Sequence, residues 1–124
     1  MAVAAKVGSR CANRSYTSLE RLFLTGVVTS PNYPEEYPDN LRMTDKIQVE
    51  QGLLIIVQFT DFSTEKNADW MTLTDGDGTA LMGKTSGVSL PANISSRTNV
   101  INVLFQTDHS VTRKGWSFSW SAGG

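Results

Sequence analysis

One short segment near the C-terminal end restricts the possible folds of this chain more than any other. Between residues 115 and 121 three aromatic side chains, Trp116, Phe118 and Trp120, alternate with three serines. Successive side chains of a β-strand point to opposite faces, so a strand gathers the aromatic rings on one face, whereas a helix spreads them around its surface. We therefore predict a strand whose aromatic face packs into a hydrophobic core.

Other apolar segments have the same character. Residues 53–59 form an apolar run rich in β-branched side chains, which predicts an inner strand covered on both faces. Residues 99–106 place Ile101, Val103 and Phe105 on one face, which predicts a strand with one buried face. Weaker strands are predicted at residues 25–29, 46–49, 69–74 and 79–82, separated by turn-forming residues. Many short strands of this kind are typical of an all-β fold, either a sandwich or a barrel.

Length, charge and hydropathy exclude several classes of protein. The 124 residues fit one domain, residues 1–124, in which we expect residues 1–17 to form an irregular N-terminal extension. The net charge of −1 and the scattered basic residues argue against a nucleic-acid partner. The longest apolar run, residues 53–57, is far shorter than the roughly 20 residues that span a bilayer, so we expect no membrane insertion.

The sequence does not indicate an enzyme. It contains neither a GxSxG elbow nor a cysteine and histidine pair with an orienting residue. His109 is the only histidine, and its neighbours Asp108 and Ser110 point away from it in an extended loop, so we expect no catalytic triad. Residues 75–78, DGDG, lack the later glycine and the terminal glutamate of an EF-hand, and they are predicted to form a hairpin turn.

Several motifs, in order along the chain, resemble those of CUB domains. Residues 29–40, TSPNYPEEYPDN, are similar to the opening motif of that family. Residues 59–65, FTDFSTE, residues 105–110, FQTDHS, and residues 115–116, GW, resemble later motifs, and the resemblance runs from about residue 26 to residue 120. It implies an antiparallel β-sandwich of the CUB-like jelly-roll type, and a non-catalytic module that binds proteins or glycans.

The resemblance also implies a calcium site at one end of the sandwich. Matched motif by motif, Glu65, Asp69 and Asp108 correspond to the carboxylate ligands of the family, and the carbonyl of Ser110 corresponds to a further ligand. Ca²⁺ takes about six to eight oxygen ligands, and carboxylates from separate loops can supply several of them. The implied function is recognition of a protein partner through a Lys or Arg side chain that docks on the calcium site.

Further residues are assigned around that site by the same resemblance. Tyr33 corresponds to a tyrosine that braces the site, and His109 lies beside the expected partner-binding surface. The chain from Glu65 to Asp69 is shorter than in the family, which makes Asp61 an alternative ligand. Val111 stands where calcium-binding members often have an asparagine.

The chain departs from the family most clearly in its cysteines. Met43 and Ser86 stand where the family has cysteines, no cysteine occurs near residues 66–68, and Asp45 replaces a tryptophan. Cys11 resembles the first family cysteine but, as the only cysteine of the chain, it cannot form an intramolecular disulfide. The resemblance implies an extracellular or secreted protein, whereas the cysteine count favours a reducing compartment.

A second hypothesis is a calcium-independent, spermadhesin-like glycan-binding domain. It would use exposed aromatic side chains together with Arg113 and Lys114, which could meet an anionic glycan. If the chain is secreted, Asn13 and Asn93 are candidates for N-glycosylation, since each begins an Asn-X-Ser sequence.

Overall fold

The computed structural model of the protein describes residues 24–123. The predictions for residues 1–17, including those for Cys11 and Asn13, lie outside the described residues. The strands are β1 (Thr25–Thr29), β2 (Arg42–Gln48), β3 (Leu54–Ser63), β4 (Trp70–Asp75), β5 (Ala80–Thr85), β6 (Ile94–Ser95), β7 (Val100–Gln106) and β8 (Gly115–Gly123). Residues 24–123 contain no helix, and hence none long and apolar enough to cross a membrane.

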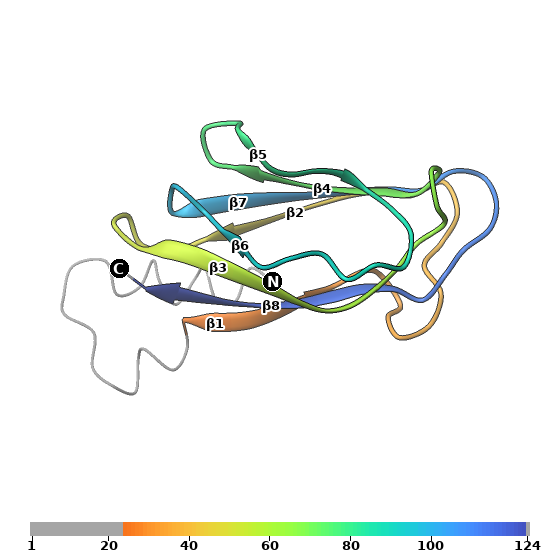
Figure 1. The fold of residues 1–124 in the computed structure, drawn as a ribbon, viewed down its shortest axis with the longest axis horizontal. Coiled ribbons are helices and arrows are strands. Elements are labelled where there is room, and N and C mark those ends of the chain that lie inside the picture. Colours follow the sequence, from red (N-terminus) through yellow and green to blue (C-terminus); the bar gives the residue numbers. More distant parts are fainter. Residues whose placement is uncertain (1–23, 124) are drawn as a thin grey trace.

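The strands form two antiparallel sheets that lie face to face (Figure 1). The first, which we call the β8 sheet, has the order β1-β8-β3-β6, and the second, the β7 sheet, has the order β2-β7-β4-β5. The strands with the clearest alternation, β7 and β8, take inner positions in the two sheets. This arrangement confirms the predicted all-β antiparallel sandwich.

The core lies between the sheets and is rich in aromatic rings. Trp116, Phe118 and Trp120 are at most 2% exposed, which confirms that the alternating segment buries its aromatic face. The ring of Phe105 on β7 meets that of Trp116 edge to face, with 5.7 Å between centroids, and meets that of Tyr37 at 4.9 Å. Tyr37 therefore joins the core to the loops at one end of the sandwich.

Strand β3 confirms one expectation and corrects another. It is an inner strand, because it pairs with β8 on one side and β6 on the other. The prediction that both of its faces are covered is wrong. Ile55, Val57 and Phe59 are buried, but Leu54 and Ile56 on the other face are 41% and 52% exposed. The reason is that the outer face of an antiparallel sandwich sheet can face water, so an apolar run does not require two covering layers.

Two further differences concern the extent of strands. Strand β2 begins at Arg42, earlier than predicted, because it pairs along its whole length with β7 although its own residues are largely polar. Strand β6 was not predicted, since Ile94–Ser95 is too short to show a period.

The predicted turn at residues 75–78 is confirmed. It connects β4 to β5, and its Gly78 N–H donates to the Asp75 carbonyl at 2.9 Å.

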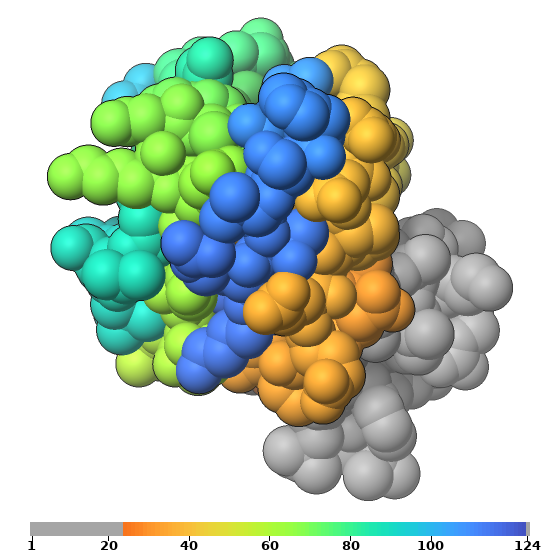
Figure 2. Space-filling model, turned by 90° about the vertical axis from the view of Figure 1, so that its right-hand side faces the viewer, coloured from red at the N-terminus to blue at the C-terminus, as the bar shows by residue number. Residues whose placement is uncertain are grey.

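Four loops meet at one end of the sandwich: residues 30–41, 64–69, 86–93 and 107–114. Figure 2 looks onto this end, where the β7–β8 loop in blue crosses between the β1–β2 loop in orange and the β3–β4 loop in green. Backbone hydrogen bonds join the loops, for example Asn40 N–H to the Asp108 carbonyl at 2.7 Å and Thr64 N–H to the Gly87 carbonyl at 2.9 Å. The loops therefore form one connected surface.

Candidate functional site

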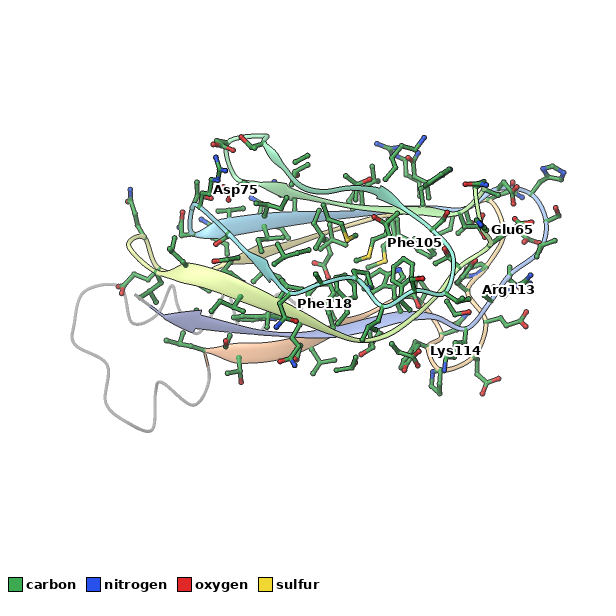
Figure 3. The ribbon with its side chains drawn as sticks, in the orientation of Figure 1. Glu65, Asp75, Phe105, Arg113, Lys114 and Phe118 are labelled. Carbon is green, nitrogen blue, oxygen red and sulfur yellow. The ribbon has the colours of Figure 1, made fainter. Side chains whose placement is uncertain are left out.

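The loop end carries a cluster of three carboxylates, which we call the acidic cluster. It consists of Glu65, Asp69 and Asp108, and one carboxylate oxygen from each lies within 4.8 Å of the others. Glu65 and Asp69 come from the β3–β4 loop and Asp108 comes from the β7–β8 loop, at the end of the sandwich where Figure 3 labels Glu65. The structure thus brings together the three carboxylates that the family resemblance selected.

The tight β3–β4 loop explains how Glu65 and Asp69 reach the same place. The N–H groups of Ala68 and Asp69 both donate to the Glu65 carbonyl, at 3.3 and 3.1 Å, which closes a single turn of chain. Asn67 accommodates this turn with a φ of +61°, a left-handed conformation that asparagine adopts more readily than most residues. The short spacing therefore does not separate the two carboxylates.

Asp69 is the fixed centre of the acidic cluster. Its side chain is fully buried, Oδ1 accepts the Asp108 N–H at 2.9 Å, and Oδ2 accepts the Tyr37 hydroxyl at 2.6 Å. The Tyr37 hydroxyl also accepts the Glu65 N–H at 3.0 Å. Burial, followed by the hydrogen bond to Asp69, raises the pKa of Tyr37, so the phenol stays protonated and continues to donate.

Glu65 is the least satisfied member of the acidic cluster. Its Oε1 atom is buried and has no hydrogen-bond partner within the described part of the chain. Loss of solvation, followed by the negative charges of Asp108 and Asp69, raises the pKa of Glu65. A buried oxygen without a partner, beside two like charges, fits a cation, and carboxylate oxygens are the ligands that Ca²⁺ prefers.

The remaining members of the predicted site lie on the β7–β8 loop. Ser110 donates its N–H to Asp108 Oδ1 at 3.2 Å, and both Ser110 and His109 are exposed. The role of the Ser110 carbonyl as a ligand stays a prediction. Val111 has a φ of +61°, which is unusual for a β-branched residue and natural for the asparagine expected there.

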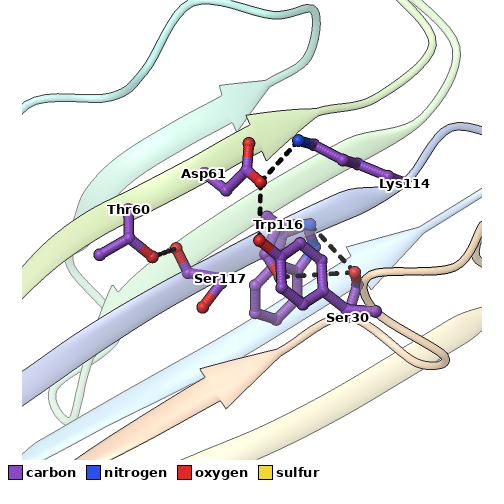
Figure 4. Close-up of polar contacts among 7 residues, drawn as sticks. Ser30, Thr60, Asp61, Lys114, Trp116 and Ser117 are labelled. Atoms are coloured by element: carbon purple, nitrogen blue, oxygen red, sulfur yellow. Dashed lines mark hydrogen bonds and ion pairs between the residues drawn. The ribbon is translucent and has the colours of Figure 1, made fainter.

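Tyr33 and Asp61 lie together, apart from the acidic cluster. Asp61 Oδ2 accepts the Tyr33 hydroxyl at 2.6 Å and forms an ion pair with Lys114 Nζ at 2.8 Å (Figure 4). The hydrogen bond from Lys114, followed by that from Tyr33, holds the pKa of Asp61 below its usual value. Tyr33 therefore braces Asp61, while Tyr37 contacts the acidic cluster. The resemblance assigned the bracing role to Tyr33, but it is Tyr37, from the same YPEEYP motif, whose hydroxyl contacts the acidic cluster.

The features expected of a glycan site do not gather on one surface. Trp116, Phe118 and Trp120 are buried in the core, so their faces are closed to a sugar. Lys114 is engaged with Asp61, whereas Arg113 lies exposed in the β7–β8 loop. Asn93 is exposed just before β6, where a glycan could be attached.

The amino-acid sequence is similar to a known domain family and to parts of larger proteins. The CUB domain family model matches residues 20–120. The chain is 37% identical over 102 residues to human cubilin, covering 77% of this chain and 3% of cubilin. It is 32% identical over 121 residues to the bovine complement C1s subcomponent, covering 91% of this chain and 17% of that protein. The chain thus spans less than a fifth of these curated relatives.

Solved structures agree with this comparison. The crystal structure of the MASP-1 CUB2 domain bound to Ca²⁺ is 30% identical with a TM-score of 0.74, and the match covers 79% of this chain and 92% of that one. The full extracellular region of zebrafish Gpr126/Adgrg6 is 29% identical with a TM-score of 0.73, over 80% of this chain and 14% of that one.

Proposed function

Because the chain belongs to the CUB domain family, we propose that it is a non-catalytic protein-recognition module whose acidic cluster holds Ca²⁺ and receives a basic side chain of the partner. The proposal rests on residues of this chain, supported by the calcium-bound state of a similar MASP-1 domain. Location outside the cell is part of the proposal. It is supported by the extracellular region among the similar structures.

The observation that carries the proposal is the buried, unpartnered Oε1 of Glu65 beside two further carboxylates. Without a cation this arrangement is costly, since a buried polar atom without a partner loses its solvation and like charges repel. Bound Ca²⁺ would supply positive charge to all three carboxylates. The protein would then bind calcium at little cost in rearrangement, because Asp69 is already held by Tyr37 and by the Asp108 N–H.

Charge explains why a basic side chain would follow. Three ionised carboxylates carry three negative charges, and a divalent cation neutralises two of them, so one negative charge remains at the loop end. A Lys or Arg of a partner meets this remaining charge, and the partner-binding affinity therefore depends on calcium. Because the interaction is electrostatic, it weakens as salt concentration rises.

Calorimetric titration of Ca²⁺ into chelator-treated protein tests the metal site directly. We expect saturable binding and a higher melting temperature with calcium, because a ligand that binds the folded state stabilises it. Asp108→Asn should abolish binding, since it removes one carboxylate while the backbone hydrogen bonds of Asp108 remain. Asp77→Asn is the matched control, because it removes the same charge from the exposed β4–β5 turn.

A lysine-containing peptide tests the second half of the proposal. The peptide should bind in calcium, lose affinity in chelator, and lose affinity when its lysine is replaced by glutamine. The proposed function is wrong if the protein takes up no calcium, or if lysine recognition is the same in chelator and in the Asp108→Asn variant. Binding on a glycan array in chelator would instead favour the calcium-independent glycan hypothesis.

A further inference from the structure

A hollow with the opposite charge lies directly beside the acidic cluster. It has a volume of about 350 Å³ and is lined by the β3–β4, β5–β6 and β7–β8 loops. Its lining includes two cations, Lys66 and Arg113, and no acidic residue. This volume is at the small end of the range of about 300–1,000 Å³ that small-molecule sites occupy. The hollow therefore suits one or two side chains of a partner rather than a large ligand. We call it the basic hollow.

The basic hollow and the acidic cluster are parts of one rigid structure. Thr64 and Gly87 form a reciprocal pair, in which Thr64 N–H donates to the Gly87 carbonyl at 2.9 Å and Gly87 N–H donates to Thr64 Oγ1 at 3.0 Å. Thr64 Oγ1 also donates to the Asp69 carbonyl at 3.1 Å. The wall of the hollow is thus hydrogen-bonded to the backbone of the central carboxylate, and the two sites keep a fixed separation.

The two charges also adjoin each other in the sequence and in space. Lys66 directly follows Glu65 in the sequence, and Arg113 lines the same hollow as Lys66. Figure 3 shows Glu65 and Arg113 at the same end of the sandwich. Since an extended chain advances about 3.3 Å per residue, one short segment can reach both sites.

The rim of the basic hollow carries exposed apolar side chains. Val88, which lines the hollow, is 75% exposed, and Leu90 in the same loop is 57% exposed. This loop is held in place at its start by the Thr64 and Gly87 pair and by the hydrogen bond from Asn67 N–H to Ser86 Oγ at 2.8 Å. A partner that enters the hollow would therefore meet an apolar side chain of Val88 next to the two cations.

We infer that the basic hollow receives an acidic side chain of the same partner segment whose basic side chain meets the acidic cluster. The inference rests on the proposed function and names its partner more narrowly. The recognised segment carries a Lys or Arg with an Asp or Glu within about three residues of it. Because the acidic cluster and the basic hollow lie side by side, the partner segment binds in one direction. A segment that is basic throughout is repelled by the cations of the hollow.

Short peptides titrated into isotope-labelled protein in calcium test this inference by NMR. Each peptide has one lysine and one glutamate, placed one, two or three residues before or after the lysine, and the matched peptides have glutamine in place of the glutamate. We expect the best glutamate peptide to bind about threefold more tightly than its glutamine partner, as for an exposed charge pair. It should also shift the amide signals of Gly87 and Val88, while the glutamine peptide shifts only those of the acidic cluster.

Lys66→Glu should remove the preference for the glutamate peptide, and a peptide with a second lysine in place of the glutamate should regain affinity for this variant. Lys46→Glu, an equal charge change on exposed β2, should leave the preference intact. Calcium titration of the Lys66→Glu variant should show that the metal site persists.

Three outcomes overturn the inference, and they are distinguishable. Equal affinity of all glutamate and glutamine peptides, with lysine and calcium still required, leaves the proposed function standing and removes the role of the hollow. Absence of any lysine-dependent binding in calcium removes both. A sulfated disaccharide that shifts Gly87 and Val88 in chelator, where the peptides do not bind, identifies the hollow as a glycan site.

Discussion

Replacement of Tyr37 by phenylalanine tests whether the acidic cluster depends on a buried hydroxyl. The Tyr37 hydroxyl donates to Asp69 Oδ2 at 2.6 Å and accepts the Glu65 N–H at 3.0 Å. Phenylalanine keeps the ring and therefore its edge-to-face contact with Phe105, 4.9 Å between centroids. The substitution thus removes two hydrogen bonds and leaves the packing of the core in place.

The expected loss follows from the two bonds. A hydrogen bond to a charged group contributes about 1.5–3 kcal/mol, and one between neutral groups contributes about 0.5–1.5 kcal/mol. Tyr37→Phe should therefore lower the free energy of unfolding by about 2–4 kcal/mol in chelator. Calcium should recover part of this loss, because the carboxylate of Asp69 regains a positive neighbour, but the affinity for calcium should fall since Asp69 and Glu65 are no longer held together.

Urea unfolding with and without calcium measures these changes, and Tyr33→Phe provides the matched control. Its hydroxyl also donates to a carboxylate at 2.6 Å, but the acceptor, Asp61, is partly exposed and keeps its ion pair with Lys114. The control should therefore lose much less stability and should bind calcium normally. If both variants lost the same amount, burial would not be the source of the effect and our account of Tyr37 would be wrong.

Three further predictions concern strain, a buried carboxylate and pH. Val111→Asn should raise the free energy of unfolding by about 1 kcal/mol, measured in urea, because it relieves a left-handed β-branched residue; no gain would argue against strain. Asp75→Ala should lower it by about 3 kcal/mol, since Arg97 N–H, Thr98 N–H and the Thr98 hydroxyl lose their acceptor. Calcium affinity should not change, because Asp75 and Glu65 lie at opposite ends (Figure 3). Finally, calcium titrations from pH 7 to pH 5 should show falling affinity, because the pKa of Glu65 is raised and the metal competes with its proton. In chelator the free energy of unfolding should depend on pH in the opposite direction. The contribution of Glu65 to stability is fully present below the ordinary pKa of a glutamate and is lost as pH rises through the raised pKa of the folded state. A calcium affinity that does not change with pH would contradict this account.

The sequence predicted those parts of the fold in which local alternation and packing agree. The segment with Trp116, Phe118 and Trp120 has a period of two, and the structure buries that face. Strand β2 has no apolar alternation in its first half, so its start at Arg42 is decided by pairing with β7 and could not be predicted from its own residues. The exposed face of β3 shows the opposite limit: apolar composition alone does not reveal whether a second layer covers a strand.

The resemblance predicted the three carboxylates of the candidate site but not the contacts that hold them. Motif order selected Glu65, Asp69 and Asp108, and the structure places them within reach of one ion. The contact between Tyr37 and Asp69 joins residues 32 positions apart, and such long-range contacts are set by the loop path rather than by any local pattern. For the same reason the sequence did not reveal that Asp61 is engaged with Tyr33 and Lys114.

The absence of paired cysteines is offset by hydrogen bonds at the β3–β4 loop. Ser86 stands where the family has a cysteine, and its Oγ accepts the Asn67 N–H at 2.8 Å, so the β3–β4 and β5–β6 loops are still joined at this point. The reciprocal hydrogen bonds of Thr64 and Gly87 lie beside this contact. Hydrogen bonds do not depend on redox conditions, so the loop that carries Glu65 and Asp69 would keep its shape in an oxidising or a reducing compartment. The cysteine count therefore loses its force as an argument about location, and the proposal of an extracellular calcium site does not conflict with it.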